Sequence, residues 1–312
     1  MNIQMKTYIN KIALVLIVTG AAFTSCESYE DFTGDFDKTT VYFATQKPLR
    51  TIVSYDEMSF KVGVSLGGKR ENTVEEYADF EIDPDLLNTV DGADVFTLLP
   101  SSYYKLSNTS KMVIPIGEFI GDVAVTLNKE LFTNDPLATQ NTYALPLKIT
   151  NSSLDSIGGF DPDGTVIDIP KNYTILVVKY ISSYSGVYYH KGTQKEVDGS
   201  GGLISETIYN NTDDVNNQTW GLSTVDRNSV KTSGIGTFTN QNFVINIDES
   251  TNAIYIDAPS SGVTNLVGTG TLNNDRSISL SYSFTLSGKN YEVEDTLVLR
   301  QPVEKDLIFE EW

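Results

Sequence analysis

Cysteine and histidine each occur once in this sequence of 312 residues, as Cys26 and His190. A single cysteine cannot form an intramolecular disulfide, so apolar burial and hydrogen bonds between strands must stabilise the fold. A serine or cysteine triad would have to be built on His190, and transition-metal sites usually draw on several histidine or cysteine ligands. His190 lies between two tyrosines and Lys191-Gly192, which favours a polar residue at a strand end over a catalytic base. We therefore expect no metal and no cofactor.

Positive charge is also scarce. Lysine and arginine number 22 against 41 acidic residues, which gives a formal net charge of −19. Nucleic-acid binding depends on neutralising phosphates with basic side chains, so this balance excludes nucleic acid as a partner. The acids are scattered over predicted turns, where solvated surface charge is the ordinary explanation, and they do not form a recognisable glycosidase pair. We expect no enzymatic activity; a hydrolase with an unrecognised carboxylate pair is the weaker alternative.

Long apolar runs are absent apart from one near the N-terminus. It follows Lys6 and Lys11, begins at Ile12 and extends for about 11 residues, the dimensions of a secretory signal. A membrane-spanning helix would need about 20 apolar residues. The segment ends in Phe23-Thr24-Ser25-Cys26, which resembles a lipobox. We predict that residues 1–25 are a signal peptide and that Cys26 carries lipid; an ordinary signal peptide that ends near a cysteine by coincidence is the alternative.

Residues 26–38 are polar and acidic, which predicts a tether between the lipid and the first domain. The stretch Glu27-Ser28-Tyr29-Glu30-Asp31 resembles the signal that directs Bacteroidetes lipoproteins to the cell exterior; a merely solvated tether is the alternative. We expect a protein of the outer membrane that faces the exterior and touches the membrane through its lipid anchor alone.

The mature chain lacks convincing amphipathic helices and carries strand patterns throughout. Apolar residues at every second position predict strands at 58–66, 123–127 and 143–149, and the continuous apolar run 173–180 predicts a central strand buried on both faces. About seven short strands over residues 39–181 are typical of an immunoglobulin-like β-sandwich. Asp161-Pro162-Asp163-Gly164-Thr165 offers oxygen ligands for calcium, but this loop is more typical of a plain turn.

Residues 182–312 are predicted to form a second all-β domain of different sequence. Ile278, Leu280, Tyr282, Phe284 and Leu286 alternate with serine and threonine, and residues 287–290 predict a hairpin to the strand 291–299. The overall fold class is therefore all-β, with a sandwich followed by a second antiparallel β-sandwich or a lipocalin-like β-barrel. Tyr255 and Tyr282 are expected in the core, and Trp312 is expected to pack against the second domain.

Several segments together resemble a two-domain surface lipoprotein of Bacteroidetes. Those segments are Thr40-Val41-Tyr42-Phe43, 143–149, 173–179, 184–189, 268–272 and 291–297. In that family the first domain is an immunoglobulin-like domain of unknown function that also precedes the catalytic barrel of some family-18 endoglycosidases. The resemblance implies a glycan-binding protein that serves a SusC/SusD-like import system. Since the catalytic barrel is missing here, binding is favoured over hydrolysis.

Sugar capture needs aromatic platforms with polar groups beside them. Trp220 is the best candidate because it lies among amide and acidic residues, although one tryptophan in a strand is more often part of the core. Arg227 and one of the tandem tyrosines, Tyr188 or Tyr189, complete the predicted site. The alternative to a glycan receptor is a structural or adhesin-type lipoprotein without a carbohydrate ligand.

Overall fold

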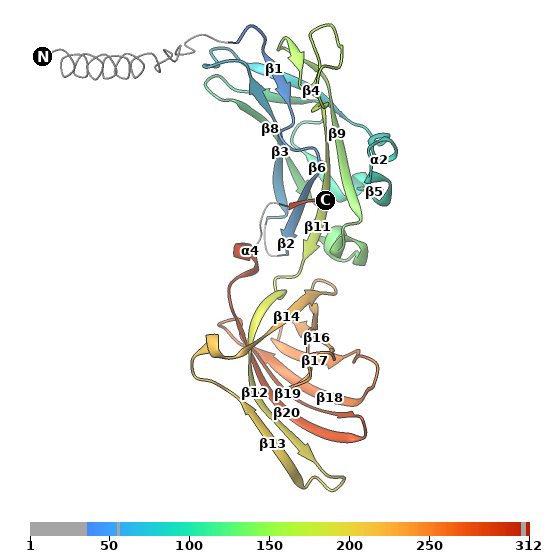
Figure 1. Ribbon diagram of the computed structural model, residues 1–312, viewed down its shortest axis with the longest axis vertical. Coiled ribbons are helices and arrows are strands. Elements are labelled where there is room, and N and C mark those ends of the chain that lie inside the picture. Colours follow the sequence, from blue (N-terminus) through green and yellow to red (C-terminus); the bar gives the residue numbers. More distant parts are fainter. Residues whose placement is uncertain (1–35, 55–56, 307–309) are drawn as a thin grey trace, which may run out of the picture. The chain divides into compact units, whose positions relative to one another are not determined.

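The computed structural model describes residues 36–54, 57–306 and 310–312. Within these ranges almost all regular structure is β, and the strands belong to two bodies (Figure 1). Each body has its own hydrophobic core. The predicted all-β class is confirmed. The predicted signal peptide, Cys26 and most of the predicted tether lie outside the described residues. Among the residues that are described, no helix is long and apolar enough to cross a membrane.

The first body is a sandwich of two sheets. One sheet contains, in spatial order, β10 (Ser156–Ile157), β1 (Thr40–Tyr42), β3 (Ser59–Gly67), β8 (Ile120–Leu127) and β6 (Tyr104–Leu106). The other contains β21 (Glu310–Glu311), β2 (Pro48–Val53), β11 (Tyr173–Ile181), β9 (Tyr143–Ser152), β4 (Glu76–Ile82) and β7 (Lys111–Ile114), with β5 (Thr97–Leu98) beside β9. The apolar side chains of both sheets meet in one core, as the predicted sandwich requires.

The strand patterns explain this packing. Along β3, Phe60, Val62, Val64 and Leu66 are buried while the residues between them reach the surface. β11 lies between β2 and β9 and is buried on both faces, which confirms the predicted central strand. The helices of the sandwich are short: α2 (Leu86–Thr89), α3 (Lys129–Thr133) and the 3-10 turns Ala93–Val95, Ser101–Tyr103 and Pro136–Thr139.

The C-terminal residues belong to this sandwich. β21 pairs with the edge strand β2, and the Trp312 indole Nε1 donates a hydrogen bond to the Ile175 carbonyl oxygen at 2.6 Å. The Trp312 ring meets Phe96 edge to face at 4.8 Å, and the Lys47 ammonium lies 4.6 Å from its centroid. The expectation that Trp312 packs against the second domain is therefore wrong. An edge strand offers unpaired backbone groups, and here the end of the chain satisfies them.

The loop Asp161–Thr165 is a turn, as predicted. Gly164 N–H donates to the Asp161 carbonyl at 2.8 Å, and Thr165 N–H donates to the Asp163 carboxylate at 2.9 Å. Gly164 adopts φ +85°, a left-handed conformation that favours glycine.

The second body is an antiparallel barrel of eight strands. In order they are β12 (Gly186–Val197), β14 (Gln218–Thr224), β15 (Ser229–Thr232), β16 (Val244–Asp248), β17 (Ala253–Asp257), β18 (Val263–Leu272), β19 (Ile278–Leu286) and β20 (Lys289–Leu299). β20 closes the barrel by pairing with β12 from Tyr188 to Val197. The second domain is thus a barrel rather than a sandwich. A further strand, β13 (Leu203–Tyr209), pairs with the C-terminal half of β12, and a short helix, α4 (Val303–Asp306), follows β20.

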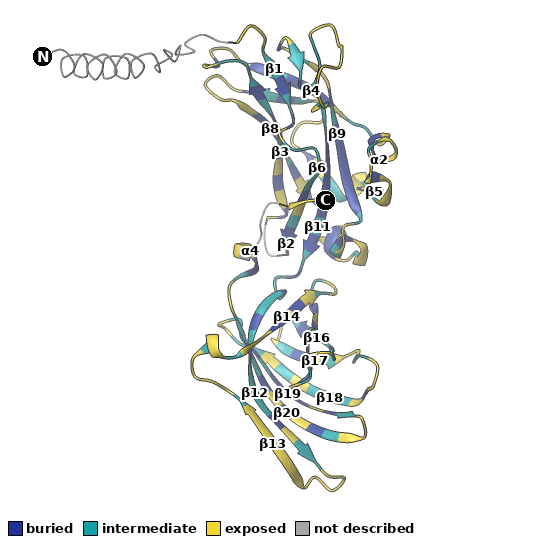
Figure 2. Cartoon of the chain, viewed as in Figure 1, coloured by how far each residue is buried: buried dark blue, intermediate teal, exposed yellow. Residues whose placement is uncertain are grey.

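The predicted β19–β20 hairpin is formed, but its turn has two residues instead of the expected four, because Lys289 and Asn290 already belong to β20. Its turn residues, Ser287 and Gly288, both have positive φ (50° and 78°), which is typical of a two-residue turn that matches the strand twist. Buried and exposed residues alternate along both strands, whereas β13 is exposed on both faces (Figure 2). The buried residues fill the barrel with apolar and aromatic side chains.

The neighbouring strand β18 makes room for these large side chains with glycine. A Cβ atom at Gly268 would lie 2.3 Å from the Cβ of Tyr282 on β19. Such an approach is impossible for any side chain, so glycine is required where the two strands meet.

Candidate functional site

Trp220 lies inside the barrel. Its side chain is 2% exposed, and its ring stacks on His190 with 3.9 Å between centroids. Gly234 covers the indole so closely that a Cβ there would lie 2.8 Å from Nε1. The prediction that Trp220 is a platform for sugar is wrong. Its polar sequence neighbours occupy a loop and the outward positions of β14, while Trp220 takes an inward position.

The other three predicted residues do not form a binding site with it. Tyr188 is buried, its hydroxyl donates to the Tyr184 carbonyl at 2.9 Å, and burial raises its pKa to about 12. Tyr189 points to the opposite face of β12, as strand alternation predicts, and is half-buried. Arg227 lies between β14 and β15, where its Nη2 is 3.1 Å from the Glu249 carboxylate.

His190 belongs to a buried polar cluster rather than to a strand end. The Asp295 carboxylate is 3% exposed and accepts hydrogen bonds from Tyr209 at 2.7 Å and from Tyr282 at 2.6 Å. The His190 Nε2 lies 2.9 Å from the same carboxylate without hydrogen-bond geometry. Burial, together with the Asp295 charge, raises the pKa of both tyrosines well above the usual value. His190, Asp295 and Tyr282 are buried and Tyr209 is partly buried, so the cluster belongs largely to the barrel interior.

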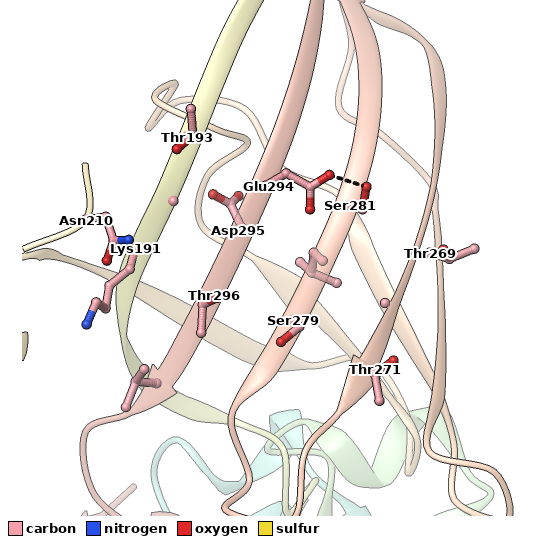
Figure 3. A pocket seen from close by; sticks show the side chains of 14 residues that line it. Lys191, Thr193, Asn210, Thr269, Thr271, Ser279, Ser281, Glu294, Asp295 and Thr296 are labelled. Atoms are coloured by element: carbon pink, nitrogen blue, oxygen red, sulfur yellow. Dashed lines mark hydrogen bonds between the residues drawn. The ribbon is translucent and has the colours of Figure 1, made fainter. Parts of the chain in front are cut away.

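A groove of about 650 Å³ lies on the outer face of β12, β20, β19 and β18 (Figure 3). Most of the side chains that line it point away from the barrel core and are small and polar, although the buried Leu280 and Asp295 line it as well. They include Lys191, Thr193, Asn210, Thr269, Thr271, Ser279, Ser281, Glu294 and Thr296. An adjoining hollow of about 520 Å³ shares Thr193, Ser281 and Glu294 with it and extends the groove along the same strands.

Strand register aligns these side chains in rows. Tyr255 pairs with Thr269, Thr269 with Ser281, Ser281 with Glu294, and Glu294 with Thr193. Directly opposite residues on neighbouring strands point to the same face, so the five side chains form one row. Thr269, Ser281, Glu294 and Thr193 line the groove, and Tyr255 continues the row on the next strand, β17. Four strand spacings of roughly 4.8 Å make this row about 19 Å long. The Ser281 hydroxyl donates to the Glu294 carboxylate at 2.6 Å, the dashed line in Figure 3.

Two parallel rows complete the polar floor. One joins Thr271, Ser279, Thr296 and Lys191, and the other joins Ser283, Glu292, Lys195 and Glu206. Each lies two residues along the strands from the central row, a separation of about 7 Å. The floor is therefore a grid of hydroxyl, carboxylate and ammonium groups with hydrogen-bonding capacity in every row.

An aromatic ring lies at one end of the central row. Tyr255 on β17 is 58% exposed, while its neighbour Ile254 is buried. The expectation that Tyr255 is a core residue is wrong, whereas Tyr282 is in the core as predicted. Alternation correctly predicted that the two faces of β17 differ, but it did not predict which face is inside. Because the groove takes residues from four strands, only the register between strands reveals it.

Both lysines of the groove are paired with acids. The Lys191 Nζ lies 2.9 Å from the Asp214 carboxylate, and the Lys195 Nζ lies 3.9 Å from that of Glu206. Glu292 and Glu294 follow each other on the outward face of β20. Nowhere in the described ranges do three or more histidine, cysteine, aspartate or glutamate residues assemble into a group that could hold a metal ion.

The chain is similar to solved structures from Bacteroides ovatus. A structural-genomics protein of unknown function is 22% identical, with a TM-score of 0.74 over 88% of this chain and 98% of that one. A second protein of unknown function (15% identity, TM-score 0.43) covers 84% of this chain and 94% of its own. A multidomain protein that includes DUF1735 (14% identity, TM-score 0.42) covers 83% and 94%. The first similarity shows a shared fold that extends over both β bodies.

A family model described as “-like, N-terminal domain” matches residues 36–156, which lie within the sandwich and the residues just before it. No protein of curated function matches the chain.

Proposed function

We propose that this protein is a glycan-binding lipoprotein of the outer membrane, lipidated at Cys26 and facing the cell exterior. It captures oligosaccharide or polysaccharide on the outer face of its barrel and serves a SusC/SusD-type import system. The observation that carries the proposal is the central row, in which the exposed Tyr255 on β17 is followed by the hydroxyl side chains and the Glu294 carboxylate of the groove.

The chemistry of this row suits a sugar. Pyranose rings have apolar faces that pack on aromatic rings, and Tyr255 offers such a face at the end of the central row, on the strand next to the groove. Sugar hydroxyls both donate and accept hydrogen bonds, and the threonine and serine hydroxyls of the floor do the same. The three rows give an extended ligand many weak polar contacts without a deep pocket, which fits capture better than conversion.

The anchoring part of the proposal rests on the sequence. The signal peptide, the lipobox-like end at Cys26 and the acidic residues that follow it favour export and lipidation. The fold shared with a Bacteroides ovatus protein is consistent with the resemblance to Bacteroidetes surface lipoproteins. Glu292 and Glu294 lie on one face of β20 and are exposed on an open groove. Glycoside hydrolysis needs two carboxyls that flank a substrate at a set separation, so this exposed pair is not typical of a glycosidase.

A binding panel tests the proposal. The purified protein is assayed against neutral, amino and acidic polysaccharides by affinity electrophoresis and calorimetry. We expect at least one glycan to bind and Tyr255→Ala to weaken it about tenfold, because a stacked ring contributes on the order of 1 kcal/mol beyond its buried area. Ile169→Ala, which truncates a side chain of the sandwich that is 73% exposed, serves as the control and should leave the affinity unchanged. Release of reducing sugar would contradict the prediction that the protein has no enzymatic activity.

A structural or adhesin-type role is the alternative, and one observation favours it. The edge strand β13 exposes Leu203, Ile204 and Ile208, and an unpaired apolar edge can pair with another chain. Failure of every glycan to bind, together with concentration-dependent association that Ile208→Lys abolishes, would favour this alternative over glycan capture.

A further inference from the structure

The groove carries more negative than positive charge. Glu292 and Glu294 lie on its floor, Glu206 lies at its margin beside Lys195, and Asp214 lies beside Lys191. Each lysine is therefore already matched by one carboxylate, and the two glutamates of β20 add charge that neither lysine pairing neutralises.

Glu294, at the centre of the groove, restricts which chemical groups of a ligand can bind beside it. An ionised carboxylate only accepts hydrogen bonds. The Ser281 hydroxyl donates to Oε1 of Glu294 and orients the group on the exposed floor of the groove. Thr193 and Ser281, its cross-strand neighbours, carry hydroxyls that can accept or donate. A ligand that meets this part of the floor must present donors, which means hydroxyl or ammonium groups.

We infer that the groove selects glycans that bear no acidic groups, that is, neutral or amino sugars, and rejects glycans that carry uronate or sulfate. This inference rests on the proposed function and names the ligand class of the same site. A uronate placed over the central row would meet Glu294 with a like charge at hydrogen-bond distance. The cations that could compensate it are held by Asp214 and Glu206.

Repulsion of this kind has a usable magnitude. Two like charges a few ångströms apart near a protein surface interact strongly enough to weaken binding by roughly tenfold or more. Loss of a hydrogen bond to a charged group weakens binding by a similar factor. Selection by charge and selection by hydrogen bonding therefore act in the same direction at Glu294.

The experiment uses chemically matched pairs of glycans with the full-length protein. Polygalacturonate is compared with its fully methyl-esterified form, and chondroitin sulfate with desulfated, methyl-esterified chondroitin; neutral α-glucan, β-glucan, mannan, xylan and galactan and the amino polymer chitosan complete the set. We expect at least one neutral or amino glycan to bind. Its affinity should be at least tenfold higher than that of any acidic glycan, measured in 150 mM salt. Glu294→Gln should weaken that binding about tenfold, while Glu130→Gln, which removes the same charge from the exposed surface of the sandwich, should change it less than twofold.

The outcomes distinguish failure of the inferred ligand class from failure of the proposed function. Binding of an acidic glycan as tightly as its neutral partner, with loss of that binding in Tyr255→Ala, would place a glycan in the groove and refute the ligand class alone. Neutral binding that Glu294→Gln leaves intact would also refute it. If no member of the set binds, the proposed function fails and the ligand class fails with it.

Discussion

Replacing Trp220 with alanine tests whether this side chain serves stability or binding. The ring is buried, stacks on His190 at 3.9 Å and is covered by Gly234, so its removal leaves a large cavity inside the barrel. Truncation of a buried tryptophan costs about 3–5 kcal/mol. At about 4 °C for each kcal/mol in a body of this size, the melting temperature of the barrel should fall by about 12–20 °C.

Differential scanning calorimetry measures this change directly. Trp220→Phe keeps an aromatic ring against His190 and should lose roughly half as much stability, which distinguishes cavity formation from general disruption. Glycan affinity, measured well below the lowered melting temperature, should stay within about twofold because the ring does not reach the groove. A melting temperature within about 3 °C of the parent, combined with loss of glycan binding, would refute the buried position and restore Trp220 as a ligand platform.

Further changes test other parts of the structure. Burial raises the pKa of the Tyr188 hydroxyl to about 12 from 10.0, so its pKa is higher in the folded than in the unfolded protein. The contribution of this group to the free energy of unfolding is therefore complete below pH 10 and falls by about 1.4 kcal/mol per pH unit up to pH 12. Urea unfolding at pH 9 and 11 should show this loss, and Tyr188→Phe should reduce it. Trp312→Ala should destabilise the sandwich by about 3 kcal/mol and leave the melting of the barrel unchanged, whereas the reverse would contradict the observed packing. Gly268→Ala should destabilise the barrel by at least about 1–3 kcal/mol, while Gly199→Ala, with open space around its Cβ position, should be neutral in the same thermal scan. Cys26→Ala should abolish metabolic labelling with palmitate and release the protein from the membrane fraction; labelling that persists would exclude Cys26 as the lipid site.

Strand positions could be predicted well because their cause is local. The alternation from Ile278 to Leu286 required a strand with one buried face, and β19 has that pattern. The apolar run from Tyr173 to Tyr180 required burial on both faces, and β11 lies between two strands. The scarcity of cysteine, histidine and basic residues is the basis of three further predictions, namely that the protein binds no metal, no cofactor and no nucleic acid.

β18 and β13 were harder to predict from the sequence, and the reason is again local. β18 contains Gly268 and Gly270 at inward positions, so its core-facing residues lack the apolar side chains on which pattern recognition depends. Their purpose becomes clear only beside Leu280 and Tyr282 of β19, whose bulk fills the space the glycines leave. β13 is exposed on both faces, so burial imposes no pattern on its sequence.

The sequence alone determined the all-β class and the alternating faces of the strands, and the anchor at Cys26 is a prediction from the sequence. Only the tertiary structure decided that Trp220 points inward, that Tyr255 points outward, and that Trp312 returns to the sandwich. A period of two tells which residues share a face, but the choice of the inner face depends on strands far apart in the chain. The groove has the same origin: Tyr255 and Thr193 lie 62 positions apart in the sequence, and closure of the barrel by β12 and β20 places them in one row.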